Sequence, residues 1–180
     1  MRLAFPSLLG MGDELVKIRE AVDAVQELIE AHPGLFRDAE IQAEFGEERP
    51  CIGDWSDPNN RGMLVTGDGI GQKSGVYCFA SPSGDILYIG KATKNNLHHR
   101  VWGHVKTPQF LEDGRRTFPK HGFRGGPEAE EYESDVREGR VRLGVITISD
   151  QELASLAEVY LHVLHKKMHS RLPIFNKQIG

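Results

Sequence analysis

The feature that most limits the fold of this chain is a pair of β-type segments, residues 75–80 and 86–91, separated by five residues. They read Gly-Val-Tyr-Cys-Phe-Ala and Ile-Leu-Tyr-Ile-Gly-Lys, and are rich in the β-branched and aromatic residues that strands favour. The connection, Ser-Pro-Ser-Gly-Asp, holds a proline and a glycine, as hairpin turns do. The two segments therefore predict a β-hairpin.

Alternation of side chains along each strand places the two tyrosines of this hairpin. Tyr77 and Tyr88 are expected to point to the same side of the sheet, with Gly90 leaving room beside Tyr88. Leu87 and Ile89 are expected on the opposite side. Cross-strand aromatic packing alone would explain such a tyrosine pair.

Patterns of apolar residues predict the remaining elements. Apolar residues at steps of three and four indicate an amphipathic helix over residues 13–31, which would pack on the core or against a partner helix. A second, acidic helix is expected over residues 37–48, and a strand over 141–148. Other helices are expected after Asn95 or Asn96, at 128–138 and at 151–169.

This order, a helix and a long loop followed by ββαβα, indicates an α+β fold. The economical solution is a small three-stranded, mostly antiparallel sheet flanked by helices. Two regions are expected. Residues 1–74 would form an acidic N-terminal helical extension and linker, and residues 75–180 the sheet-bearing domain.

Charge is unevenly distributed along the chain, although the net charge is only −4. Residues 1–74 hold 7 Lys and Arg against 14 Asp and Glu, whereas residues 88–124 hold 8 basic residues and 2 acidic ones. Local positive charge of this kind can attract a polyanion even when the whole chain is acidic.

The cysteines and the hydropathy indicate a cytoplasmic protein. Cys51 and Cys78 form neither a disulfide nor a metal-binding pattern, which suits a reducing compartment. Apolar runs stay shorter than the ~18 residues that span a bilayer, so no membrane partner is expected. The first residues do not resemble a signal peptide.

Two helical faces carry residues suited to phosphate chemistry. Arg100 and His104 lie four apart, and an arginine fork matches the oxygens of a phosphate. The last helix carries a row of one glutamate and three histidines on one face, with the glutamate projecting at the sheet. A row on one helix cannot close around a single ion, so the histidines are expected at the surface or facing phosphate. The row consists of Glu158, His162, His165 and His169.

Taken together, these residues resemble the signature of the GIY-YIG endonucleases. Gly-Val-Tyr at residues 75–77 and Tyr-Ile-Gly at residues 88–90 stand for its two halves. Lys91, Arg100, His104, Glu158 and Asn176 follow in the family's order, on elements of the expected kind. The resemblance spans residues 75–176 and departs from the pattern in Val76, in a long segment before the third strand and in the acidic N-terminal region.

The resemblance implies metal-dependent hydrolysis of phosphodiester bonds in DNA, with RNA a less expected substrate. Glu158 would hold one Mg²⁺ or Mn²⁺; Glu152 is the rival, although the helix dipole alone explains an acid at that position. Tyr77 would be the general base and Tyr88 would orient the phosphate. Arg100 would stabilise charge on the phosphate.

The resemblance gives the other site residues supporting roles. His104 and Lys91 would assist through a proton relay or by lowering the pKa of the tyrosine, and which of Tyr77, His104 and Lys91 is the operative base stays open. Asn176 would support the site through hydrogen bonds. Five basic residues near the first core helix are expected to contact the nucleic-acid backbone. They are Lys106, Arg115, Arg116, Lys120 and Arg124.

An alternative is a non-catalytic nucleic-acid-binding module of the same fold, recruited by a protein partner. The N-terminal helix would then supply the surface for that partner, or for a homodimer. Target specificity, strand preference and pathway stay open at this stage.

Overall fold

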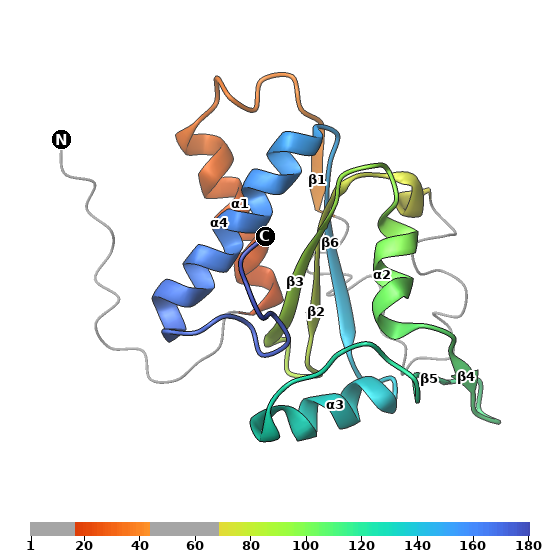
Figure 1. Ribbon diagram of the computed structural model, residues 1–180. Helices are drawn as coiled ribbons and strands as arrows, with labels where there is room; N and C mark the ends of the chain where they lie inside the picture. The colour runs from red at the N-terminus through yellow and green to blue at the C-terminus, as the bar shows by residue number, and fades with distance from the viewer. Residues whose placement is uncertain (1–16, 44–68) are drawn as a thin grey trace.

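The computed structural model, which describes residues 17–43 and 69–180, is an α+β fold built on an antiparallel sheet (Figure 1). The sheet has four strands in the order β1-β6-β2-β3, and each adjacent pair is antiparallel. The strands are β1 (Ile41–Ala43), β2 (Gly75–Ala80), β3 (Ile86–Ala92) and β6 (Arg142–Ile148). The α+β class and the hairpin agree with the sequence-based expectation.

The expectation of three strands is wrong, because β1 adds a fourth at the edge of β6. This strand falls in the segment expected to be a helix, of which residues 44–48 lie outside the described residues. Ile41 pairs with Ile148, and the amide of Glu40 donates to the Ser149 hydroxyl at 2.9 Å. The exposed edge of β6 offers unpaired backbone groups, and pairing with them outweighs a weak local helical preference.

Helices and a small ribbon surround the sheet. The helix expected over residues 151–169 is confirmed, with the Asp150 carboxylate accepting from two amides of its first turn. A short ribbon, β4 (Gln109–Phe110) and β5 (Arg116–Thr117), lies in the long segment that precedes the strand expected over residues 141–148. The helices are α1 (Ile18–Ala31), α2 (Leu97–Val105), α3 (Glu130–Arg137) and α4 (Gln151–His169), with 3₁₀ turns η2 (Ile70–Gln72) and η3 (Pro127–Ala129).

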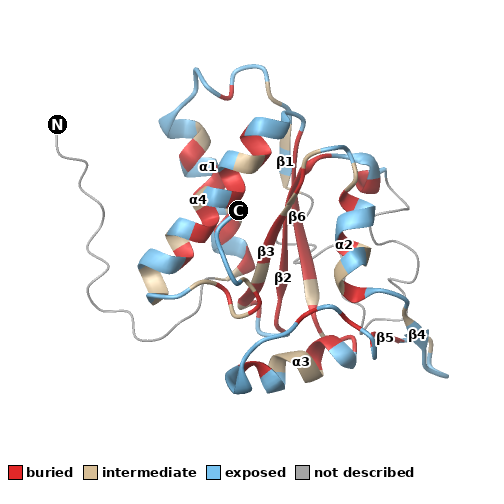
Figure 2. Cartoon of the chain, in the orientation of Figure 1, coloured by how far each residue is buried: buried red, intermediate tan, exposed pale blue. Residues whose placement is uncertain are grey.

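The helices divide between the two faces of the sheet (Figure 1), and Figure 2 shows the buried residues gathered along the strands and the inward helix faces. Alternation along β2 sends Val76 and Cys78 to one core with α1 and α4. Tyr77 and Phe79 enter the other core, with α2 and the segment around α3. The apolar stripe of α1 therefore packs on the sheet, which was the first of the two alternatives for that helix.

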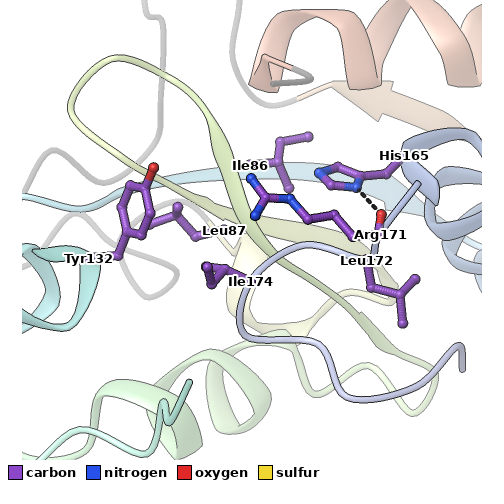
Figure 3. A pocket seen from close by; sticks show the side chains of 7 residues that line it. All are labelled: Ile86, Leu87, Tyr132, His165, Arg171, Leu172 and Ile174. Carbon is purple, nitrogen blue, oxygen red and sulfur yellow. Dashed lines mark hydrogen bonds between the residues drawn. The ribbon is translucent and has the colours of Figure 1, made fainter. Parts of the chain in front are cut away.

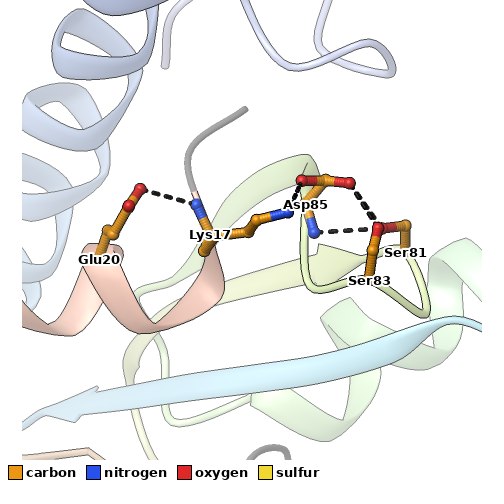
Figure 4. Close-up of polar contacts among 5 residues, drawn as sticks. All are labelled: Lys17, Glu20, Ser81, Ser83 and Asp85. Atoms are coloured by element: carbon orange, nitrogen blue, oxygen red, sulfur yellow. Dashed lines mark hydrogen bonds and ion pairs between the residues drawn. The ribbon is translucent and has the colours of Figure 1, made fainter. Parts of the chain in front are cut away.

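The start of α1 is fastened to the turn of the hairpin (Figure 4). The Lys17 ammonium lies 2.5 Å from the Asp85 carboxylate, and the Ile18 amide donates to the Gly84 carbonyl at 2.9 Å. The other Asp85 oxygen accepts from the Ser83 hydroxyl at 2.5 Å. Residues 17–43 thus share one core and one polar network with residues 75–180.

A β-bulge in β3 corrects the expected orientation of Leu87. Phe79 pairs with Tyr88 and Ala80 with Ile86, so Leu87 is the extra residue in the register. Leu87 therefore enters the same core as Tyr77, and Ile89 enters the opposite one. The bulge also gives the Leu87 carbonyl to the C-terminal tail, since the Phe175 amide donates to it at 3.0 Å.

Candidate active site

A polar pocket of about 220 Å³ lies where β3, α2, α4 and the C-terminal tail meet. Tyr88, Lys91, Arg100, Glu158 and Asn176 line it, which brings together five of the seven residues expected at the site. Tyr77 and His104 do not line this pocket. They lie directly behind Tyr88, with the Tyr77 ring centroid 6.1 Å and the His104 ring centroid 4.5 Å from that of Tyr88.

Gly90 allows the two tyrosine rings to lie together. A Cβ at this position would come 2.6 Å from the Tyr77 hydroxyl oxygen and 2.7 Å from a ring carbon of Tyr88. Tyr77 is completely buried, and its hydroxyl lies 3.0 Å from His104 Nε2. Tyr88 lies beside Tyr77 on the pocket side, with the two rings tilted by 30° to each other. A chain of polar atoms thus runs inward from the pocket through Tyr88 and Tyr77 to His104.

The protonation states of Tyr77, Tyr88 and His104 follow from the burial of their side chains. Burial raises the pKa of Tyr77 well above its usual value, and the neighbouring Tyr88 raises it further, while Arg100 acts in the opposite direction. Burial also raises the pKa of Tyr88. Burial, with a smaller effect of Arg100, lowers the pKa of His104 to about 4. At neutral pH both phenols are therefore protonated and His104 is a neutral acceptor for the Tyr77 hydroxyl.

Aromatic stacking holds His104 in place. Its ring stacks on Phe123 with centroids 5.1 Å apart and an interplanar angle of 7°. Phe123 in turn stacks on Phe175 of the tail, with centroids 4.9 Å apart. The stack connects α2 to the C-terminal tail and fixes the imidazole behind the tyrosines.

Lys91, Arg100 and Glu158 give the pocket its charge. The Lys91 ammonium lies 2.7 Å from Glu158 Oε2, and the glutamate is only 5% exposed. Arg100 Nε donates to the Lys91 carbonyl at 3.2 Å, which directs the guanidinium along β3. Because Lys177 also lines the pocket, the side chains of the pocket present three cations and one carboxylate, an arrangement that suits an anionic ligand accompanied by a cation.

Asn176 fixes the tail to β3 through two side-chain hydrogen bonds of the kind that a neighbouring strand would make with its backbone. Its side-chain oxygen accepts from the Ile89 amide and its side-chain nitrogen donates to the Ile89 carbonyl, both at 2.9 Å. The Ile89 amide and carbonyl, at the edge of β3, are thereby hydrogen-bonded by a side chain, as the backbone of a neighbouring strand would otherwise do. The expected supporting role of Asn176 thus has a structural counterpart in these two bonds.

Glu158, and not its rival Glu152, lies at the pocket. Glu152 is exposed in the first turn of α4, where its amide bonds Asp150. Among residues 17–43 and 69–180 no group of three His, Cys, Asp or Glu side chains could enclose a metal ion. One buried carboxylate facing a polar pocket nevertheless fits Mg²⁺ or Mn²⁺, which keep several waters and bind phosphate oxygens.

The histidines of α4 differ from the surface positions expected for them. His162 and His165 are each 1% exposed, and His162 lines the same pocket as Glu158. His165 turns to a separate hollow, where its Nδ1–H donates to the Arg171 carbonyl at 2.9 Å (Figure 3). The surface alternative is wrong at these two positions, because the tail folds back over this side of α4 (Figure 1). The phosphate-facing alternative stays a prediction for His162, which lines the polar pocket.

The residues expected to contact nucleic acid lie outside the pocket, near the end of α2 and around the β4–β5 ribbon. Lys106, Arg115, Lys120 and Arg124 are exposed, as that role requires. Arg116 is only 6% exposed, which counts against the contact with the nucleic-acid backbone expected of it. Its guanidinium lies 5.8 Å from the centroid of the Phe110 ring, where it helps to hold the ribbon.

Comparison of the chain with models of protein families, with curated proteins and with solved structures found no match. Across the described part of the chain, no helix has the length and apolar character needed to cross a membrane.

Proposed function

We propose that this chain is a divalent-metal-dependent endonuclease of the GIY-YIG type that hydrolyses phosphodiester bonds in DNA. The observation that carries the proposal is the meeting of Tyr88, Lys91, Arg100, Glu158 and Asn176 at one pocket. These residues come from three separate elements and the tail, and resemblance to the signature selected each of them. The free, buried Cys78 agrees with a cytoplasmic location for the enzyme.

Each lining residue has a role that follows from its position. Arg100 binds the scissile phosphate through its guanidinium fork and stabilises the charge that develops there. Lys91 neutralises Glu158 and, because it lines the pocket, is within reach of an anionic ligand. Glu158 would hold the metal ion, which when bound supplies positive charge for the phosphate and the leaving oxygen. Asn176 keeps β3 and the tail in register.

The tyrosine–histidine chain gives a route for the proton of the attacking water. Water in the pocket would give a proton to the Tyr88 hydroxyl, which would pass its own to the neighbouring Tyr77, and Tyr77 would pass its own to His104 Nε2. Both phenols stay neutral throughout, as their raised pKa values require. In this relay His104 is the final proton acceptor, and Tyr77 passes the proton on without direct contact with the water.

Cleavage of supercoiled plasmid in the presence of Mg²⁺ or Mn²⁺ tests this proposal. The wild-type protein should nick or linearise the plasmid, and EDTA should prevent it. Glu158→Gln and Arg100→Ala should each lower the rate at least about 100-fold, since each removes charge stabilisation of the transition state. His99→Ala is the matched control, because His99 is exposed next to Arg100 and does not line the pocket.

One observation favours the second candidate, a binding module without turnover. Tyr77 is fully buried and Glu158 is ion-paired, so neither acts on a ligand without some rearrangement. Retention of plasmid in a gel-shift assay, with the plasmid left intact under both metals, would favour that module over the nuclease. α1 is then a weak candidate for the partner surface, because its apolar stripe is occupied by the core.

A further inference from the structure

His162 is the one pocket-lining histidine for which the proposed nuclease has no use. It is 1% exposed, and within residues 17–43 and 69–180 neither of its ring nitrogens has a partner in hydrogen-bonding geometry. Asn176 is its neighbour, but the amide oxygen and one amide proton of Asn176 are engaged with Ile89, so only the second amide proton faces no backbone partner. A buried polar group without a partner destabilises the folded protein, so such a group needs an explanation.

The position of His162 relative to Glu158 explains why a buried imidazole would have no hydrogen-bond partner. The two residues lie four apart on α4, so their side chains project from the same face of the helix on successive turns. Both line the same pocket of about 220 Å³. An imidazole and a carboxylate on successive turns can bind one ion from the same side, and the rest of its coordination sphere stays open to water and phosphate oxygens.

We propose that Glu158 and His162 together form the metal site, and that this site prefers a divalent transition ion to Mg²⁺. Mg²⁺ favours oxygen ligands and gives up its water reluctantly, whereas imidazole nitrogen suits the transition ions. The inference rests on the proposed function for its biological meaning, and it names the class of ion that the nuclease would use.

Lys91 also belongs to this site. Its ammonium lies 2.7 Å from Glu158 Oε2, where it neutralises a carboxylate that is 5% exposed. An ion bound by Glu158 and His162 would take over that neutralising charge. Lys91, which lines the pocket, would then be released towards the anionic ligand.

Calorimetric titration of the full chain with Co²⁺, and separately with Mg²⁺, tests the proposal. His162→Phe retains a ring and removes both nitrogens, so Co²⁺ binding should weaken about 10- to 100-fold while Mg²⁺ binding changes less than about threefold. Glu158→Gln should weaken the binding of both ions. His169→Phe is the matched control from the same row and should change neither, since His169 does not line the pocket.

A measurement on the unaltered protein covers the case in which His162→Phe does not fold. In ¹⁵N-labelled wild-type protein, Co²⁺ should shift or broaden the ring resonances of His162 before those of His169. An effect centred on His165 and His169, whose rings lie 4.8 Å apart, would overturn the proposal. So would a folded His162→Phe variant with unchanged Co²⁺ affinity.

The outcomes separate this inference from the nuclease itself. Co²⁺ binding that depends on Glu158 and His162, without plasmid cleavage, supports the metal site and counts against the enzyme. Plasmid cleavage by a His162→Phe variant that keeps the wild-type preference among ions supports the enzyme and overturns the two-residue site.

Discussion

Replacing Gly90 with alanine should disrupt the arrangement of the two tyrosines. The new Cβ would lie 2.6 Å from Tyr77 Cζ and from its hydroxyl oxygen, and 2.7 Å from Tyr88 Cε1. Carbon atoms pack at about 3.5–4.0 Å, so the rings would have to move by about 1 Å. Tyr77 has no free space to do so, because it is 0% exposed and packs between Phe79 and His104.

The size of the effect follows from these contacts. Overpacking costs about 1–3 kcal/mol, and weakening the bond between Tyr77 and His104 costs about 1 kcal/mol. Reduced freedom of the unfolded chain returns about 0.4–1 kcal/mol for a glycine-to-alanine change. A net loss of about 1–3 kcal/mol should lower Tm by about 3–10 °C for a chain of this length. Loss of plasmid cleavage should accompany it.

Thermal unfolding followed by circular dichroism measures this loss, and the near-ultraviolet signal reports on the tyrosine environment. Gly103→Ala is the matched control, because a Cβ there meets nothing within 4 Å and Gly103 lies within α2. Alanine favours a helix over glycine, so this variant should keep or raise Tm. A Gly90→Ala protein with wild-type Tm and an unchanged near-ultraviolet spectrum would refute the close packing of the rings.

Three further predictions concern pH and the tail. Burial raises the pKa of Asp85, but hydrogen bonds from Lys17 and from nearby serines outweigh it and hold that pKa below its usual value. The stabilisation is therefore present above about pH 4 and is lost as pH falls, so Asp85→Asn should destabilise the protein to urea at pH 7 and much less at pH 3. Asn176→Ala removes both bonds to Ile89 and should lower the free energy of unfolding by about 1–3 kcal/mol, measured by urea denaturation at pH 7. Burial and a neighbouring guanidinium lower the pKa of His104 to about 4, so the wild-type protein should lose stability from about pH 6.5 down to 4, and His104→Phe should flatten that pH dependence.

The sequence predicted well those elements whose own pattern determines them. The hairpin of β2 and β3 has alternating apolar residues around a Pro- and Gly-containing turn, and it forms as expected. The last helix has a capping Asp150 and a continuous apolar stripe, and its bounds agree with the prediction. The prediction failed for strand β1, which was expected to be part of a helix. This strand forms by pairing with the edge of β6, more than 100 residues away in the chain, and local propensity does not encode that contact.

The candidate site shows the same division. Spacing along α4 placed Glu158 towards the sheet, where the structure has it. The same helical spacing did not reveal that His162 and His165 are buried, because burial there comes from residues 171–176 folding back over α4. The orientation of Leu87 was wrong for a related reason, since a bulge changes the alternation by one residue without a clear mark in the sequence.

The C-terminal tail connects the stability of the sheet to the formation of the pocket. β3 is an edge strand, and its free backbone groups are engaged by the Phe175 amide and the Asn176 side chain. The same two tail residues line the pocket, and Phe175 also stacks on the Phe123 ring that holds His104. A change that releases the tail would therefore expose the edge of β3, remove one wall of the pocket and loosen the imidazole behind the tyrosines together. Edge protection and site assembly thus depend on the same contacts, and stability and activity should fall in parallel when those contacts are weakened.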